Sequence, residues 1–116
     1  ARMALFLKSD VLNRGETLEA LASADGGNIV IFVITPDGQM VNVTAMADRS
    51  SDGLAVQLPY EAFASKAGDA YLLLAVSSPD ELPAFERGEA GEMAAFLEAL
   101  ANGAGVSAAV KFVRKR

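Results

Sequence analysis

The amino-acid sequence predicts a mainly β protein, an antiparallel sandwich of two sheets with one α-helix in the C-terminal half of the chain. Three observations predict this class. Two apolar runs have the length of a strand, other segments alternate apolar and polar residues, and Gly, Pro, Asn and Asp separate these segments at short intervals. A chain of 116 residues, 52% of them hydrophobic, is long enough for one core. Residues 1–116 are therefore expected to form a single domain.

The first strands are separated by segments of turn-forming residues. Residues 3–8 form a short apolar strand, and residues 10–15, DVLNRG, are expected to form a turn because Asn, Asp and Gly tolerate bent backbone. Residues 17–24 alternate with period two, which indicates a half-buried strand. Residues 25–28, DGGN, supply the positive φ angles of a hairpin. The run 29–34, IVIFVI, is apolar on both faces and β-branched, which favours a central strand over a helix.

The middle of the chain continues the same pattern. Residues 35–38, TPDG, form a tight turn, and residues 39–44 return as a strand. Residues 47–53, ADRSSDG, are polar and are expected to form a loop. Residues 54–58 alternate again, with two leucines and a valine facing inward, and Pro59 ends the strand because it lacks an N–H group.

The second half contains the predicted helix. Residues 60–68 fit either one helical turn or an irregular crossing, whereas residues 71–76, YLLLAV, form the second apolar run and another central strand. Residues 89–102 form the helix, and Gly103 suits its C-terminal cap. Its apolar stripe, which we expect to pack on the protein's own sheet, is Met93, Phe96, Leu97 and Leu100.

Residues 106–113 form the last strand, with Val106, Ala108, Val110 and Phe112 on one face. Runs of strands joined by short turns favour antiparallel pairing. The expected architecture is thus an immunoglobulin-like sandwich of about seven strands with one helix.

Composition excludes several classes of function. The chain has no Cys, His or Trp, which excludes disulfide scaffolds, thiol nucleophiles, Cys/His metal sites and Ser-His-Asp triads. The net charge of -5 disfavours nucleic-acid and anionic-lipid partners. No apolar run approaches the roughly 20 residues that span a bilayer. Position 1 is not Met, which fits a fragment or a mature form, and the localisation stays open.

Three segments together carry a family resemblance. They are residues 14–43, RGETLEALASADGGNIVIFVITPDGQMVNV, residues 54–59, LAVQLP, and residues 68–83, GDAYLLLAVSSPDELP. The sequence resembles the domain of unknown function 4384 family in the order of its strands and turns over residues 15–83. That resemblance implies a non-catalytic accessory domain attached to a caspase-like peptidase, a Ser/Thr kinase or an envelope protein in bacteria. It implies no catalytic residue and no cofactor.

Carboxylates are the most abundant catalytic residue type in the chain. Six acidic residues lie around the predicted helix start and on the helix: Asp80, Glu81, Glu86, Glu89, Glu92 and Glu98. A general acid and a general base need two carboxyl groups at a fixed separation, one of them desolvated. We expect these side chains to be solvated instead, although a small hydrolase using acids within residues 80–92 is an alternative.

Other polar segments have simpler interpretations. Asp37, Asp48 and Asp52 lie in turns or loops and lack the spacing of a calcium loop. Ser77 and Ser78 have no histidine base. The glycine-rich segments 25–27 and 103–105 lack the context of a phosphate-binding loop. The basic tail, which is expected to discourage pairing at a strand edge, comprises Lys111, Arg114, Lys115 and Arg116.

We therefore expect a non-catalytic interaction domain of a larger bacterial protein, with a protein or peptide as its partner. The surfaces available to a partner would be the sheet edges and residues 45–53 and 77–91. No residue is assigned to catalysis, to a cofactor or to a metal. A homo-oligomeric structural module that uses an open edge strand is a further interpretation.

Overall fold

The computed structural model describes residues 2–64, 68–82, 86–88, 90–103 and 105–116. Glu89, Ala104 and parts of the segments 60–68 and 68–83 therefore lie outside the described residues. The strands are β1 (Ala4–Leu7), β2 (Val11–Leu12), β3 (Thr17–Ser23), β4 (Asn28–Ile34), β5 (Met40–Asn42), β6 (Ala47–Ser50), β7 (Gly53–Pro59), β8 (Ala70–Ser78), β9 (Arg87–Gly88) and β10 (Ser107–Lys115). The helix α1 spans Ala90–Ala101, and two 3₁₀ turns span Thr44–Met46 and Tyr60–Ala62.

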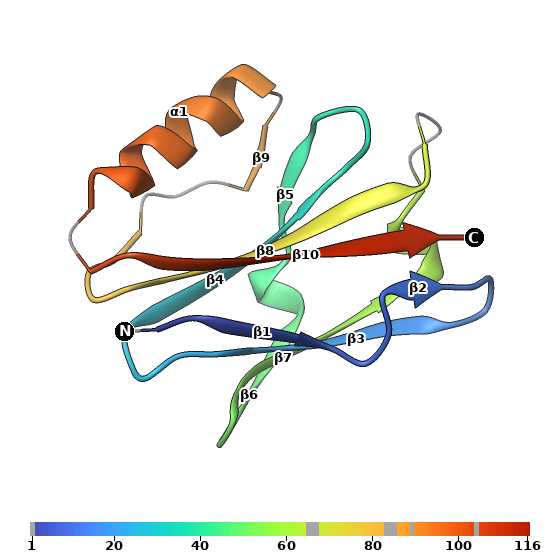
Figure 1. Cartoon of the computed structure of the whole chain (residues 1–116), viewed down its shortest axis with the longest axis horizontal. Helices are drawn as coiled ribbons and strands as arrows, with labels where there is room; N and C mark the ends of the chain where they lie inside the picture. The colour runs from blue at the N-terminus through green and yellow to red at the C-terminus, as the bar shows by residue number, and fades with distance from the viewer. Residues whose placement is uncertain (1, 65–67, 83–85, 89, 104) are drawn as a thin grey trace.

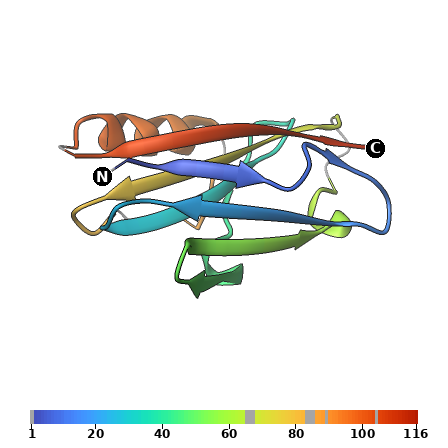
Figure 2. The same ribbon diagram turned by 60° about the horizontal axis from the view of Figure 1, so that its bottom comes forward.

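The strands form two sheets that pack face to face, which confirms the predicted β-sandwich (Figure 1). The four-stranded sheet has the order β1-β3-β7-β6, and the six-stranded sheet has the order β2-β10-β8-β4-β5-β9. Figure 2 shows the helix lying outside the six-stranded sheet. The segment that holds β9 and α1 lies between β8 and β10 in the chain.

The main core fills the space between the two sheets. We call it the inner core. Alternate residues of β3 and β7 are buried in it, including Leu18 and Leu58, as the period-two patterns predict. From the opposite sheet, Ile31 and Leu73 are fully buried. Tyr71, at the start of β8, packs edge-on against the ring of Phe63 with centroids 5.0 Å apart. Both apolar runs are adjacent central strands, as expected.

A second apolar cluster lies beneath α1, and we call it the outer core. The predicted stripe of the helix packs here on the outer face of β4, β5 and β8, as expected. Phe96 contacts the edge of the Phe32 ring at a centroid distance of 5.3 Å. Leu100 is buried near the C-terminal end of the helix, after which the Gly103 N–H donates to the Leu100 carbonyl. The helix therefore covers part of one face of the six-stranded sheet that would otherwise be apolar and exposed.

Two predicted linking segments contain strands. Residues 47–53 do not form a loop throughout, because residues 47–50 form β6 and pair with β7. The pairing uses backbone groups, so the exposed polar side chains of β6 give no alternating pattern. Residues 10–15 contain β2, which pairs in parallel with the end of β10. The Arg114 N–H donates to the Asp10 carbonyl at 2.8 Å, so pairing is not wholly antiparallel.

The predicted strand 39–44 is shorter than expected. Strand β5 ends at Asn42, and a 3₁₀ turn begins at Thr44. The Thr44 N–H donates to Asn42 Oδ1 at 2.9 Å, and Thr44 Oγ1 accepts the Ile31 N–H at 2.9 Å. Polar side chains thus replace the strand ladder here. The ambiguous segment 60–68 begins with one 3₁₀ turn, Tyr60–Ala62.

Two glycines are required by close backbone approach. Gly27, with φ of 86°, lies so near Ser78 that a Cβ atom would overlap the Ser78 carbonyl oxygen. Gly53, with φ of 137°, lies equally near the carbonyl of Ala22. Both positions also hold backbone conformations that side chains rarely adopt, so each turn depends on glycine.

Candidate binding surface

The two faces of β10 differ in their surroundings. Val113 is buried in the inner core and Ala109 packs against it, so Val110 and Phe112, which alternate with them, point to the outer face of the six-stranded sheet. Val110 and Phe112 on that face are 50% and 72% exposed. The alternation along β10 predicts which residues share a face. The more apolar of its two faces points outward.

Strand register extends this apolar surface across the sheet. Phe112 lies opposite Leu72 of β8, and Leu72 lies opposite Ile34 of β4. Ile34 in turn lies opposite Met40, which is buried under α1. Leu72 and Ile34 are only partly buried. We call the four residues Ile34, Leu72, Val110 and Phe112 the outer strip.

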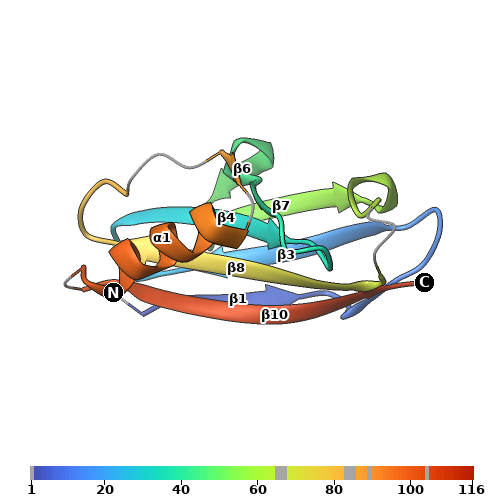
Figure 3. The same cartoon turned by 90° about the horizontal axis from the view of Figure 1, so that it is seen from above.

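The helix ends the outer strip on one side and borders a hollow. Figure 3 shows α1 over one end of the sheet, while β8 and β10 continue beyond it. A hollow of about 270 Å³ separates the C-terminal half of α1 from β10. It is lined by apolar or small residues: Leu74, Val76, Leu97, Leu100, Ala101, Gly103, Val106 and Ala108. The outer strip and the hollow together form a continuous uncharged surface along β10.

The sheet edges offer little for pairing with a peptide. β2 and β9 have two residues each, and β6 has four residues, of which Asp48, Arg49 and Ser50 are exposed and polar. The long edge of β10 is flanked by β1 (Figure 2). The Met3 N–H also donates to Ser107 Oγ at 2.9 Å. Short and charged edges discourage strand addition.

The acidic residues singled out from the sequence lie apart from any enclosed site. The side chains of Asp80, Glu81, Glu86, Glu92 and Glu98 are all exposed. Within the described ranges, no group of three or more His, Cys, Asp or Glu side chains is placed to hold a metal ion. Since an acid–base pair needs a desolvated carboxyl group, the hydrolase alternative gains no support from these positions.

The other polar candidates have local partners or none. Asp37 accepts a hydrogen bond from the Thr35 hydroxyl within the turn after β4. Ser78 Oγ accepts the Asp80 N–H at 3.2 Å. Ser77 is fully buried, and its hydroxyl has no hydrogen-bond partner among the described residues.

The remaining polar candidates lie in turns or edge positions. Asp48 lies on β6 and Asp52 in the turn that follows it. Gly26 and Gly27 have the positive φ angles expected for the loop between β3 and β4.

The basic tail is held against the domain. Arg114 Nε forms an ion pair with Asp69 at 3.3 Å, although both side chains are largely exposed. The Arg116 carbonyl accepts a hydrogen bond from the Tyr60 hydroxyl at 2.7 Å, and Lys115 Nζ lies 5.5 Å from the centre of the same ring. Strand β10 is paired on both sides at this end, so the tail does not lie on an open edge.

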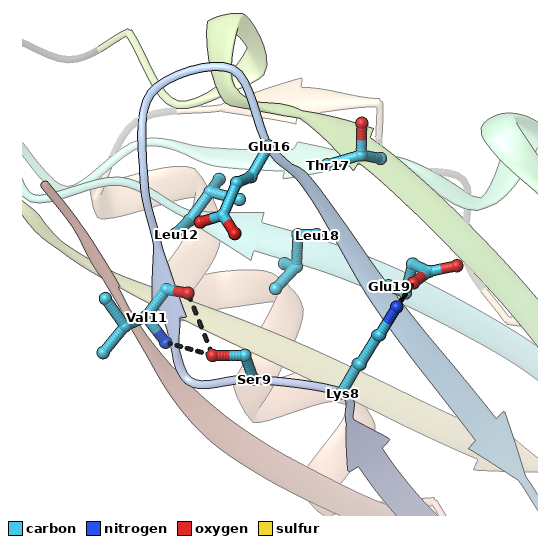
Figure 4. A pocket seen from close by; sticks show the side chains of 8 residues that line it. All are labelled: Lys8, Ser9, Val11, Leu12, Glu16, Thr17, Leu18 and Glu19. Atoms are coloured by element: carbon cyan, nitrogen blue, oxygen red, sulfur yellow. Dashed lines mark hydrogen bonds and ion pairs between the residues drawn. The ribbon is translucent and has the colours of Figure 1, made fainter.

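A smaller hollow of about 200 Å³ lies where the chain passes from β1 to β2 and β3 (Figure 4). Its polar groups already bond one another. Lys8 Nζ lies 2.9 Å from Glu19 Oε2, which raises the pKa of Lys8 and lowers the pKa of Glu19 through the hydrogen bond and charge attraction of the pair. Ser9 Oγ bonds the backbone of Val11, and Glu16 accepts the Asn13 N–H. These contacts shape the crossing between sheets and leave few groups for a ligand.

No family model, curated protein or solved structure matches this chain. In the part of the chain that the structure describes, no helix is both long and apolar enough to cross a membrane. The function is therefore inferred from the surface itself.

Proposed function

We propose that this domain is a non-catalytic interaction module that binds an apolar segment of a protein partner along the outer strip. The exposure of Val110 and Phe112 beside a partly covered sheet carries the proposal. Contiguous apolar surface on a soluble domain marks interaction sites more often than isolated exposed residues do. Aromatic residues are also enriched at the centres of protein interfaces.

The shape of the surface supports a side-chain docking mode. Phe112 projects from the sheet, and the hollow beside α1 offers space lined by small residues such as Ala101 and Ala108. A partner with alternating large and small apolar residues would fill the hollow and cover the strip. Burying Phe112 and Val110 in this way would stabilise the complex by roughly 1.5–3 kcal/mol per side chain before the costs of association.

A partner of different sequence fits this surface better than a second copy. Two copies would each carry a net charge of -5 and would repel one another over the length of an interface. The resemblance to bacterial accessory domains agrees with a partner elsewhere in a larger protein or complex.

Selection from a phage-displayed library of short random peptides tests the proposal. Peptides selected on the wild-type domain should be rich in apolar and aromatic residues. Each should bind the Val110→Ser and Phe112→Ser variants about tenfold or more weakly, because the anchoring contacts are lost.

The matched control is Phe6→Ser. Phe6 is 58% exposed on β1, in the other sheet, and its replacement should leave peptide binding unchanged. Selected peptides that bind both outer-strip variants as tightly as the wild type would contradict the proposal. Light scattering that shows a dimer dissolved by Phe112→Ser would identify a second copy as the occupant and would also overturn it.

A further inference from the structure

We propose that the open side of the sandwich contains a second, separate binding site, a pocket for a small carboxylic acid with an apolar body. The pocket has a volume of about 380 Å³ and lies where β5 and β9 extend the larger sheet beyond the inner core. This volume falls within the range of small-molecule sites, at its lower end. The outer strip lies on the opposite face of the same sheet, so the two sites are independent.

The floor of the pocket is apolar and belongs to the inner core. Val33 and Val43 come from the larger sheet and the turn after β5, and Leu58 comes from β7. Val41 lies beside them and is partly exposed to the pocket. A ligand on this floor would remove apolar surface of both partners from water, which favours an alkyl or aromatic body.

The mouth of the pocket is formed by segments that are distant in sequence. Met46, at the end of the first 3₁₀ turn, is 51% exposed and lines the pocket. Ala62, from the second 3₁₀ turn, and Ala64 also line it. A flexible methionine beside two small residues gives a rim that adapts to ligands of different shape.

Arg87 gives the pocket a cationic group. On β9 it lies directly opposite Val41, which in turn lies opposite Val33, so the three side chains follow one row on the inner face. Arg87 is exposed, and no ion pair among the described residues involves it. A guanidinium group presents a planar pair of donors that matches a carboxylate. The register therefore places a carboxylate-binding group at the end of an apolar floor.

Asp37 is the other charged residue of the lining, and it is already engaged. Its carboxylate accepts the Thr35 hydroxyl and so stabilises the turn between β4 and β5. Its negative charge disfavours an anionic ligand, but its carboxylate already accepts a hydrogen bond, whereas no ion pair among the described residues engages Arg87. The arrangement thus selects a carboxylate over an amine.

The test uses octanoate and 3-phenylpropionate as probes, with octylamine as the cationic counterpart. Titration followed by two-dimensional NMR should show that both carboxylates shift the backbone signals of Val41, Val43 and Leu58. Octylamine should shift them less at the same concentration. Arg87→Met, which keeps an apolar stem and removes the charge, should weaken carboxylate binding about tenfold.

Four further variants make the result decisive. Arg49→Met removes an exposed arginine of β6 and should leave binding unchanged. Ala62→Phe should block the mouth and abolish the binding of octanoate and 3-phenylpropionate, whereas Asp37→Asn should strengthen the binding of these two carboxylates. Phe112→Ser should have no effect, which separates this site from the outer strip.

The proposal would be overturned if octylamine bound more strongly than the two carboxylates. It would also be overturned if carboxylate binding survived Arg87→Met and Ala62→Phe. If Arg87→Met fails to fold, the wild-type shifts decide alone. Signals that shift only outside the pocket, or none that shift, would then count against it.

Discussion

The inner core and the outer core bury similar side chains in different settings. The inner core is enclosed by two sheets, and its central residues such as Ile31 and Leu73 are fully buried. The outer core is enclosed by one helix that crosses only one end of a sheet, and its border is the hollow of about 270 Å³ beside β10. The inner face of the six-stranded sheet thus fixes the fold, whereas part of its outer face leaves apolar side chains exposed, and this is the surface that we propose a partner covers.

The largest effect should come from Leu73→Ala. Leu73 is fully buried on β8, where neither sheet can collapse into the space left by the missing atoms. We expect the free energy of unfolding to fall by about 3–4 kcal/mol. Urea denaturation followed by circular dichroism measures it, and a cost under about 1.5 kcal/mol would mean that the inner core is loosely packed.

The same replacement in the outer core, Leu100→Ala, should cost about 2 kcal/mol, since α1 can settle toward the sheet. Leu100 is 6% exposed and lines the hollow. Amide hydrogen exchange should become faster in α1 and remain slow in β4 and β8. Equal costs for Leu100→Ala and Leu73→Ala, with exchange accelerated throughout, would remove the distinction between the two cores.

Replacing two adjacent serines of β8, which point to opposite faces of the sheet, should change the stability in opposite directions. Ser77→Ala should raise the free energy of unfolding by about 1 kcal/mol, because it removes a buried hydroxyl without a partner among the described residues. Ser78→Ala should lower it by about the same amount, because the Asp80 N–H loses its acceptor. Thermal and urea unfolding of both variants measure the difference. A loss of stability in Ser77→Ala would indicate that its hydroxyl is hydrogen-bonded.

The smallest effect concerns the outer face of the four-stranded sheet, on the opposite side of the sandwich from α1. There Glu19 accepts hydrogen bonds from Lys8 and from Gln57, and the pKa of its carboxyl lies below the ordinary value of 4.5. A pKa that is lower in the folded than in the unfolded protein stabilises the fold at pH values above the unfolded-state pKa. This contribution disappears as the pH falls through the folded-state pKa. For Lys8, the raised pKa adds stability below 10.5 that disappears as pH rises through the folded value.

NMR titration of the Glu19 side chain should therefore give a midpoint below 4.5 that rises toward it in Lys8→Met. Added salt should shrink the difference, because both side chains are exposed. An unchanged midpoint in Lys8→Met would show that the ion pair does not persist in solution.

The sequence predicts most of the architecture because long strands carry their pattern in side chains. IVIFVI and YLLLAV are adjacent central strands, and the helix packs through its predicted stripe. The strands β2, β6 and β9 were not predicted, since a run of two to four residues is too short to show a periodic pattern. Their pairing depends on where distant segments lie, which local periodicity does not contain.

The two candidate surfaces could be predicted less well from the sequence than the architecture. The alternation in β10 places Val110 and Phe112 on the same face. Whether that face is exposed depends on the register of β10 with β8 and on how far α1 extends over the sheet, and neither can be seen in the sequence. Arg87 follows a segment without strand pattern, and its place beside Val41 arises from the pairing of β5 with β9. A side chain's neighbours across a sheet are set by tertiary pairing, so neither surface has a linear motif.

The glycines at positions 27 and 53 have a consequence for tracing the ancestry of this domain. Each turn brings one main chain against another so closely that even a methyl group is excluded, whatever the domain binds. Divergent descendants are free to exchange the exposed residues of the outer strip. They should nevertheless retain glycine before β4 and at the start of β7, and this pair offers a marker of common descent where overall similarity has faded.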